Sequence, residues 1–180
     1  MRSLRSAFAL ALLAALVPAP APARVFGFCT AIPLPPASRW PLEGATPPPC
    51  MPVTVPAPHG TMHLAVVTTE ELREQGLMNV SRIPVDEGML FVFQDPDGTL
   101  NFWMKNTIVP LDMIFIKGDG TISSIAADVP ATKPGTPDDQ VARRSGFGHF
   151  VIELGAGNAA RLGLKPGERL AGVPFTTSSR

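Results

Sequence analysis

The sequence NFWMKNTIVPLDMIFI, residues Asn101–Ile116, decides the fold of this chain. Two apolar segments, Leu100–Thr107 and Leu111–Lys117, lie on either side of Pro110 and have the composition of β-strands. They also contain a lysine, an asparagine and an aspartate, which core strands exclude unless each group is paired and hydrogen-bonded. The stretch therefore predicts a β-rich core that holds either a polar brace or a binding site.

Side-chain alternation predicts how the two segments face each other. If they pair about the turn between them, Lys105 lies opposite Asp112 and Trp103 lies opposite Ile114. We therefore expect a cross-strand ion pair beside an indole, within an otherwise apolar shell. A shift of one residue would destroy this pairing, so the expected pocket depends on the register.

The residues around this stretch predict one mainly β domain over residues 60–174. Further strands are expected at Met62–Thr68, Gly88–Phe93, Thr121–Ala127, His149–Leu154 and Arg169–Val173. Short helices are expected at Glu70–Gln75, opened by a capping box of Thr68 and Glu71, and at Ala156–Leu162. Residues 118–120 indicate a hairpin turn, and residues 129–147 indicate a long irregular loop. Many short strands divided by turn residues favour a compact β-barrel or sandwich with two short helices.

The N-terminus predicts export. Arg2 and Arg5 precede the apolar stretch Ala7–Val17, and small residues follow up to Ala23. This pattern is typical of a secretory signal peptide over residues 1–23, the alternative being a retained membrane anchor. The apolar stretch is shorter than the roughly 20 residues that span a bilayer. We expect a periplasmic or extracellular protein with no transmembrane anchor after cleavage.

A proline-rich extension over residues 24–58 follows the signal. Its prolines forbid helix and interrupt sheet pairing, so an extended arm is expected. Cys29 and Cys50 are expected to form a disulfide in an oxidising compartment, the alternative being free or intermolecular thiols. Residues 175–180 are expected to be a disordered tail.

Charge excludes one class of partner. The chain has 15 basic and 15 acidic residues, a formal net charge of zero, without runs of like charge. Nucleic-acid-binding domains carry a basic patch or stripe, so no nucleic acid is expected as a partner. The expected partner is an unknown small molecule or a component of the cell envelope.

Several motifs resemble one family. They are GLM (Gly76–Met78), EGMLFVF (Glu87–Phe93), FWMKNT (Phe102–Thr107), PLDMIFI (Pro110–Ile116) and VIEL…LGLKPG (Val151–Gly167). In this order they closely resemble DUF192, a family of small, often exported bacterial and archaeal proteins. The resemblance implies a compact mainly β fold but no established activity. Arg73 lies where the family's arginine before GLM is expected, whereas the cysteines that many members carry before the position of His149 are missing here.

The candidate ligand-binding site combines polar residues with an indole. Its members are Arg73, Glu87, Trp103, Lys105, Asn106, Thr107, Asp112 and His149. An amphipathic ring with a few convergent polar groups is typical of small-molecule pockets, and Lys105 would anchor a carboxylate there. The alternative is structural, with Lys105–Asp112 and Arg73–Glu87 ion pairs bracing the fold and Asn106 capping the turn.

Two other functions have weaker support. Soft metal binding is suggested by Cys50, Met51, His59, Met62 and His63, residue types that suit Cu(I), but their spacing is irregular. Catalysis centred on His149, with Ser145 nearby, lacks the GxSxG pattern of a nucleophile elbow. We therefore expect a non-enzymatic binding module without catalytic residues, metal or cofactor.

Overall fold

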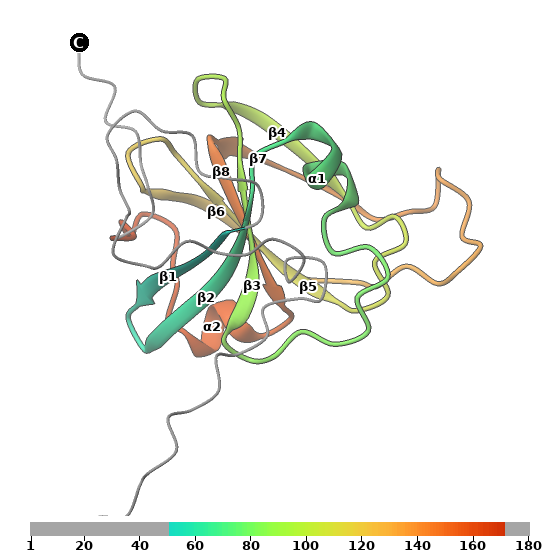
Figure 1. Cartoon of the computed structure of the whole chain (residues 1–180), viewed down its shortest axis with the longest axis horizontal. Coiled ribbons are helices and arrows are strands. Elements are labelled where there is room, and N and C mark those ends of the chain that lie inside the picture. Colours follow the sequence, from blue (N-terminus) through green and yellow to red (C-terminus); the bar gives the residue numbers. More distant parts are fainter. Residues whose placement is uncertain (1–50, 172–180) are drawn as a thin grey trace, which may run out of the picture.

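The computed structural model describes residues 51–171, and these residues confirm the predicted mainly β class. The elements are β1 (Met51–Ala57), β2 (Gly60–Val67), α1 (Glu70–Gln75), β3 (Glu87–Val92), β4 (Gly98–Trp103), β5 (Leu111–Ile116), β6 (Ile122–Val129), β7 (Arg143–Gly148), β8 (Phe150–Gly155) and α2 (Asn158–Arg161). Figure 1 shows how these strands twist about one another. No helix within residues 51–171 is long and apolar enough to cross a membrane.

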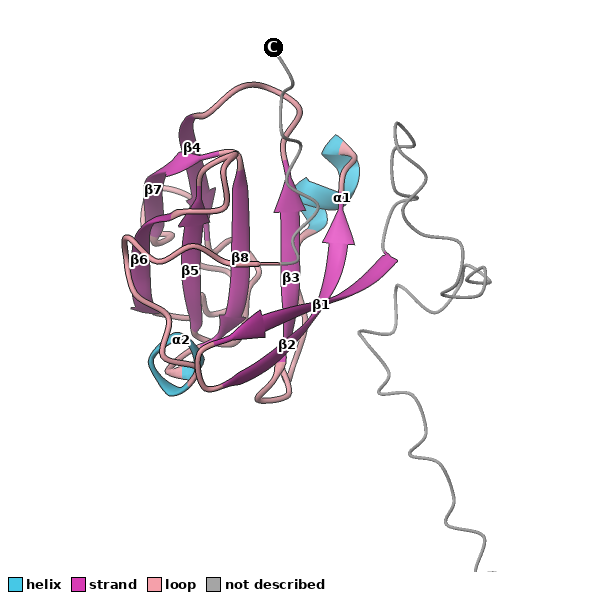
Figure 2. Ribbon diagram, turned by 90° about the vertical axis from the view of Figure 1, so that its left-hand side faces the viewer, coloured by secondary structure: helices cyan, strands magenta, loops and turns pink. Residues whose placement is uncertain are grey.

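The strands form one large sheet and one small one. Six strands lie in the order β1-β2-β3-β8-β5-β6, and β4 pairs only with β7 in a separate two-stranded ribbon. Within the large sheet β2 and β3 are parallel, connected through α1, and the other neighbours are antiparallel. Figure 2 shows β6, β5, β8 and β3 side by side, with α1 and α2 at opposite ends. In the described part of the chain β1 and β6 remain edges, so the architecture is that of a sandwich and not of a closed barrel.

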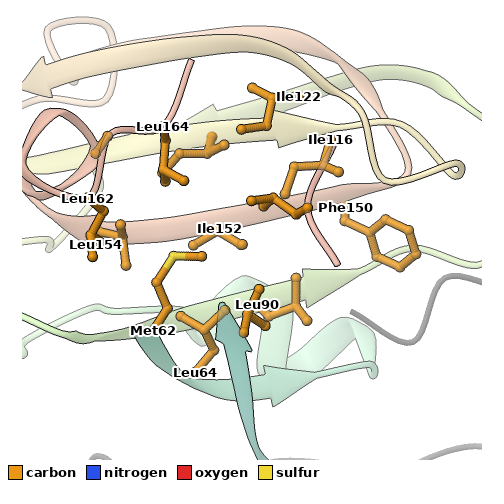
Figure 3. Close-up of a cluster of buried hydrophobic side chains, with 14 of the residues drawn as sticks. Met62, Leu64, Leu90, Ile116, Ile122, Phe150, Ile152, Leu154, Leu162 and Leu164 are labelled. Carbon is orange, nitrogen blue, oxygen red and sulfur yellow. The ribbon is translucent and has the colours of Figure 1, made fainter. Parts of the chain in front are cut away.

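Side-chain alternation gives the large sheet two apolar faces. On one face Met62, Leu90, Ile114 and Ile152 pack with residues around α2, as Figure 3 shows for part of this cluster. On the other face Met89, Phe91, Met113 and Phe115 pack beneath the β4–β7 ribbon and the segment that follows α1. The second face contains the candidate site, because α1 and β4 leave a gap there.

The prediction of an irregular loop over residues 129–147 was wrong for its last part. Arg143–Gly148 form β7, although two charges and two glycines lower the strand propensity of this segment. The glycines are needed for packing: a Cβ at Gly146 would lie 2.2 Å from Cγ of Phe115, and one at Gly148 would lie 2.4 Å from the carbonyl oxygen of Ile116. Glycine thus lets β7 cross the large sheet at very short range.

The predicted hairpin of residues 100–107 and 111–117 was also wrong. β4 ends at Trp103 and pairs with β7, while β5 pairs with β6 and β8. Residues 104–110 form a turn in which Asn106 has a positive φ of 52°. Asn106 is one of the residue types that tolerate this conformation. After this turn the chain continues into β5, which pairs with β6 and β8 and not with β4.

The two helices and most other strands lie close to their predicted positions. α1 spans the predicted residues and ends at Gly76, but its N-cap is Thr69, whose Oγ1 accepts a hydrogen bond from Leu72 N at 3.3 Å. α2 is shorter than predicted. The strand expected to begin at Arg169 is represented by one β-bridge between Thr121 and Arg169.

Part of the proline-rich extension belongs to the sheet. Met51–Ala57 form β1 and pair with Gly60–Val66 of β2. Within the described residues β1 is an edge strand. Proline is tolerated in an edge strand because N–H groups on its outer side have no neighbouring strand to bind. The predicted signal peptide, the Cys29–Cys50 disulfide and the C-terminal tail lie outside the described residues.

Candidate functional site

A cavity of about 290 Å³ lies between α1, β3, β4 and β8. Its walls come from the helix and the following GLM segment on one side and from the aromatic residues of β3 and β4 on the other. The lining residues are Glu70, Arg73, Glu74, Gln75, Gly76, Leu77, Met78, Phe91, Phe93, Asn101, Phe102, Trp103, Thr107 and Glu153. This volume is at the lower end of the range for small-molecule sites.

Glu153 is the most unusual residue of this cavity. It lies at the centre of the large sheet, directly between Met89 of β3 and Met113 of β5, and only 4% of its surface is exposed. Within residues 51–171 no group makes a hydrogen bond or an ion pair with its carboxyl group, which lines the cavity. Removal from water raises the pKa of Glu153 to about 8, so the carboxyl group is mostly protonated at neutral pH.

An aromatic wall stands beside Glu153. The ring of Phe102 meets Phe91 edge to face at 5.0 Å and Phe93 at 6.2 Å between centroids. Phe102 and Trp103 end β4, and Phe91 belongs to β3, so two different sheets supply the wall. Such mutual edge-to-face contacts hold the rings in fixed orientations around the cavity.

Arg73 lines the cavity and does not form the ion pair with Glu87 that the structural alternative expected. Its Nη1 donates hydrogen bonds to the carbonyl oxygens of Thr68 at 2.6 Å and Val92 at 3.1 Å. The guanidinium also lies 5.0 Å from the ring centroid of Phe93. Glu87 is the first residue of β3 and lies beside His63, whereas Arg73 contacts Val92 at the last residue of β3. Arg73 therefore ties α1 to the ends of β2 and β3.

The predicted ion pair between Lys105 and Asp112 is not formed. Lys105 Nζ lies 2.9 Å from Oδ2 of Asp138, and both side chains are partly exposed. Lys105 and Arg143 each contact the indole of Trp103, at 4.9 and 5.0 Å from its centroid. The register explains the error, because Trp103 lies opposite Arg143 on β7 and not opposite a residue of β5.

Asp112 has a structural environment on the other face of the sheet. Its carboxylate accepts hydrogen bonds from the backbone N–H groups of Ala159 at 2.8 Å and Asp128 at 2.9 Å. Only 1% of its surface is exposed. The aspartate thus fixes the start of α2 and the end of β6, and it does not face the cavity.

Of the remaining predicted site residues, some lie in or beside the cavity and others lie outside it. Thr107 is buried and lines the cavity, with its hydroxyl donating to the carbonyl oxygen of Lys105 at 3.3 Å. Asn106 lies next to the cavity, where its Nδ2 contacts Met78 Sδ at 3.8 Å. His149 and Glu87 lie outside it. His149 packs its ring on Phe150, with 4.5 Å between centroids.

Glu87 is a second buried carboxyl group. Its Oε2 has no hydrogen-bond partner within the described chain, and 6% of the residue is exposed. Burial, and then the neighbouring charge of Asp86, raise the pKa of Glu87, while His63 opposes them. Residues 51–171 contain no group of three or more His, Cys, Asp and Glu side chains that could hold a metal ion.

The chain has clear relatives. The DUF192 family model, described as "Uncharacterized ACR", matches residues 53–172. This chain belongs to the DUF192 family. The DUF192 match covers all ten helices and strands of the structure except the first two residues of β1. No curated protein is significantly similar to the chain.

Two solved structures are similar to this DUF192 protein. One is a "putative transcription regulator" from Sinorhizobium meliloti 1021, which is 33% identical, with a TM-score of 0.58 over 71% of this chain and 98% of its own. The other is a protein of unknown function from Novosphingobium aromaticivorans DSM 12444, which is 31% identical, with a TM-score of 0.56 over 71% of this chain and 94% of its own. Both show the same family architecture and name no ligand.

Sequence reasoning found part of the cavity and missed its centre. Arg73, Trp103 and Thr107 were predicted site residues and line the cavity. Glu153 was not considered, although it is a carboxylate within the apolar segment VIEL. The rule that drew attention to Lys105, a charged residue inside a core strand, applies equally to Glu153 and would have identified it.

Proposed function

We propose that this DUF192 protein is an exported, non-enzymatic binding protein whose small ligand occupies the cavity around Glu153. The observation that carries the proposal is the buried, unpartnered carboxyl group of Glu153 at the cavity wall. An unpaired buried polar group costs roughly 1–3 kcal/mol, whereas a methionine at this position would continue the apolar row of Met89 and Met113. A bound ligand that pairs with the carboxyl group would offset this cost.

Arg73 and Lys105 already have partners within the protein and are therefore weak candidates for anchoring a ligand. Arg73 is occupied by two backbone carbonyl groups, and Lys105 is occupied by Asp138. The two ion pairs of the bracing alternative, Lys105–Asp112 and Arg73–Glu87, are not formed; Arg73 instead connects α1 with β2 and β3, and Lys105 forms an exposed ion pair with Asp138. The binding proposal does not depend on them, because Glu153 makes no such contact.

A thermal-shift screen of metabolites and envelope components tests the binding proposal. A ligand that binds only the folded state stabilises it by about 2.7 kcal/mol at a hundredfold excess over Kd, which raises Tm by several degrees. The same compound should lose this effect on Glu153→Met and keep it on Asp139→Asn, an exposed control. A ligand that shifts wild type and Glu153→Met equally would refute the assignment of the site.

Export rests on the N-terminal pattern and has its own test. The full-length chain expressed in a Gram-negative host should appear in the periplasmic or extracellular fraction, with Arg24 as its first residue by N-terminal sequencing. Recovery in the cytoplasm with an intact N-terminus would contradict export while leaving the binding proposal open to the thermal-shift test.

A further inference from the structure

We propose that the ligand in this cavity carries a small organic cation, an amine or a quaternary ammonium group, that pairs with Glu153 against the aromatic wall. This inference rests on the proposed function and specifies the chemistry of the same site. Three features of the described residues support it: the charges that line the cavity, the rings that form part of its wall, and the unpaired carboxyl group of Glu153 in the lining.

The ionisable groups that line the cavity are mostly acidic. Glu70 and Glu74 lie at the exposed rim on α1, and Glu153 lies inside. Arg73 is the single cation among the lining residues, and its Nη1 is already bound to two carbonyl oxygens. Among the lining residues the acidic groups outnumber the arginine, which favours a positively charged ligand on the α1 side of the cavity; Lys105 and Arg143 lie on the Trp103 side.

The aromatic wall is suited to positive charge. Two of its rings already contact cations of the protein, Phe93 with Arg73 and Trp103 with Lys105 and Arg143. Aromatic faces attract cations through their quadrupole, and rings that surround a site are a known means of holding quaternary ammonium groups. Phe91 and Phe102, which also line the cavity, would present apolar surface to the organic part of such a ligand.

Glu153 supplies the counter-charge through a balanced proton exchange. In the free protein its carboxyl group is mostly protonated at neutral pH. A permanent cation within contact distance favours the carboxylate, so the O–H proton of Glu153 leaves to the solvent as the ligand enters. One proton is released and one ion pair forms, with no covalent change in the ligand.

The other charged groups around the cavity oppose or assist this exchange to different degrees. Arg73 on α1 favours the Glu153 carboxylate, while Glu70 and Glu74 on α1 disfavour it. β3 and β4 contribute no ionisable residue to the lining, but Lys105 in the turn after β4 and Arg143 of β7 lie against the ring of Trp103 and also favour the carboxylate. The neighbours of Glu153 in the sheet, Met89 and Met113, are uncharged.

Choline and its neutral isostere 3,3-dimethylbutan-1-ol test the proposal, because choline keeps its charge at every pH. Calorimetric titrations of wild type and Glu153→Gln, in buffers of different ionisation enthalpy, measure affinity and proton release together. We expect wild type to prefer choline to the alcohol, to release close to one proton, and to bind choline more tightly by up to about tenfold per pH unit as the pH rises toward 8. Titration with n-butylammonium extends the test to amines.

The variant Glu153→Gln keeps the shape of the side chain and removes the charge. It should bind choline roughly tenfold more weakly or worse, lose the proton release, and bind the alcohol as wild type does. Glu74→Gln, an exposed rim variant, should change choline affinity by only about twofold because solvent screens its charge. A melting curve of each variant shows that the fold is kept.

Two results would overturn the inference. If the alcohol binds wild type as tightly as choline, with no pH dependence, the ligand is not a cation, although the proposed binding function stands. If neither choline nor n-butylammonium binds at millimolar concentration, the cationic chemistry is wrong, and the thermal-shift screen of neutral and anionic compounds decides the proposed function separately. Flotation of the protein with phosphatidylcholine vesicles would assign the same cationic group to a lipid, and binding of free choline alone would assign it to a soluble compound.

Discussion

Gly146 of β7 lies directly against the aromatic ring of Phe115 of β5. A methyl group at Gly146 would come within 2.2–2.5 Å of three ring atoms, and the ring itself is fully buried. This contact allows the β4–β7 ribbon to cover the large sheet closely, and it therefore also positions Phe102 and Trp103 at the cavity. The absence of a side chain at Gly146 therefore affects where the aromatic residues of the cavity lie.

Substitution Gly146→Ala should accordingly lower the free energy of unfolding by about 1–3 kcal/mol, the usual cost of overpacking a core. Urea denaturation measures this. Gly98→Ala is the matched control, since the nearest atom to its added Cβ is Pro96 O at 3.6 Å, and it should change stability far less. Equal stability of the two variants would mean that β7 can move away from Phe115 without loss.

Asp112 should be a stability residue with no role in ligand binding. Asp112→Ala removes the acceptor for the N–H groups of Ala159 and Asp128, and it should cost about 2–4 kcal/mol because both bonds are charge-assisted and the carboxylate is buried. Denaturant titration measures the free energy of unfolding of this variant and of Asp139→Ala, which serves as an exposed control. A loss below about 0.5 kcal/mol would show that α2 keeps its position without this cap.

Lys105→Ala should have little effect on stability. The pair Lys105–Asp138 is exposed, with 35% and 58% of the two side chains accessible, and such pairs contribute at most about 1 kcal/mol. A double-mutant cycle with Asp138→Ala measures the coupling, which should decrease further at high salt. Trp40 and Trp103 are the two tryptophans of the chain, so Trp40→Phe leaves Trp103 as the fluorescent indole. In this background the fluorescence of Trp103 should change on Lys105→Ala, because the ammonium of Lys105 lies 4.9 Å from the ring.

The burial of Glu153 should make stability depend on pH. Its pKa is about 8 in the folded chain and near 4.5 when solvated, so between these values the folded state binds one more proton than the unfolded state. The free energy of unfolding should therefore fall as pH rises from about 4.5 to 8, by up to a few kcal/mol from this group. Below 4.5 both states are protonated and the effect vanishes.

The variant Glu153→Gln provides the comparison for this pH effect. It cannot ionise, so its stability should decline less steeply than that of wild type over the same interval, and the difference should be largest above pH 8. Chemical denaturation at a series of pH values measures both curves. Parallel curves would show that Glu153 ionises normally in the folded protein.

Sequence patterns predicted the elements whose signals are local. The helix Glu70–Gln75 follows from capping residues and a terminal glycine, and β3, β5 and β8 follow from short apolar runs. The pairing of strands was not predictable in this way, because Trp103 pairs across 40 residues with Arg143 and not across the nearby turn. A hairpin is the simplest solution for adjacent strands, but here β4 pairs with β7 and β5 pairs with β6 and β8.

The candidate site likewise has parts that were predictable from local sequence and parts that depend on long-range pairing. Trp103 and Thr107 were identified because polar and amphipathic groups inside an apolar run are unusual, and they do line the cavity. The proposed partner of Lys105 was wrong because it was inferred from register alone. Glu153 is a charged residue inside an apolar run, so the same rule identifies it, but the cavity that it lines was not predictable because its walls come from elements that are distant in the sequence.

A proline of β1 has a consequence for self-association. Pro56 lacks the N–H group that another residue would offer for pairing at the outer side of β1, an edge strand of the sheet that residues 51–171 form, so a second polypeptide would meet an interrupted hydrogen-bond ladder there. The missing N–H group hinders the addition of a strand from another molecule to β1. Proline at this edge therefore opposes aggregation through intermolecular β-sheets.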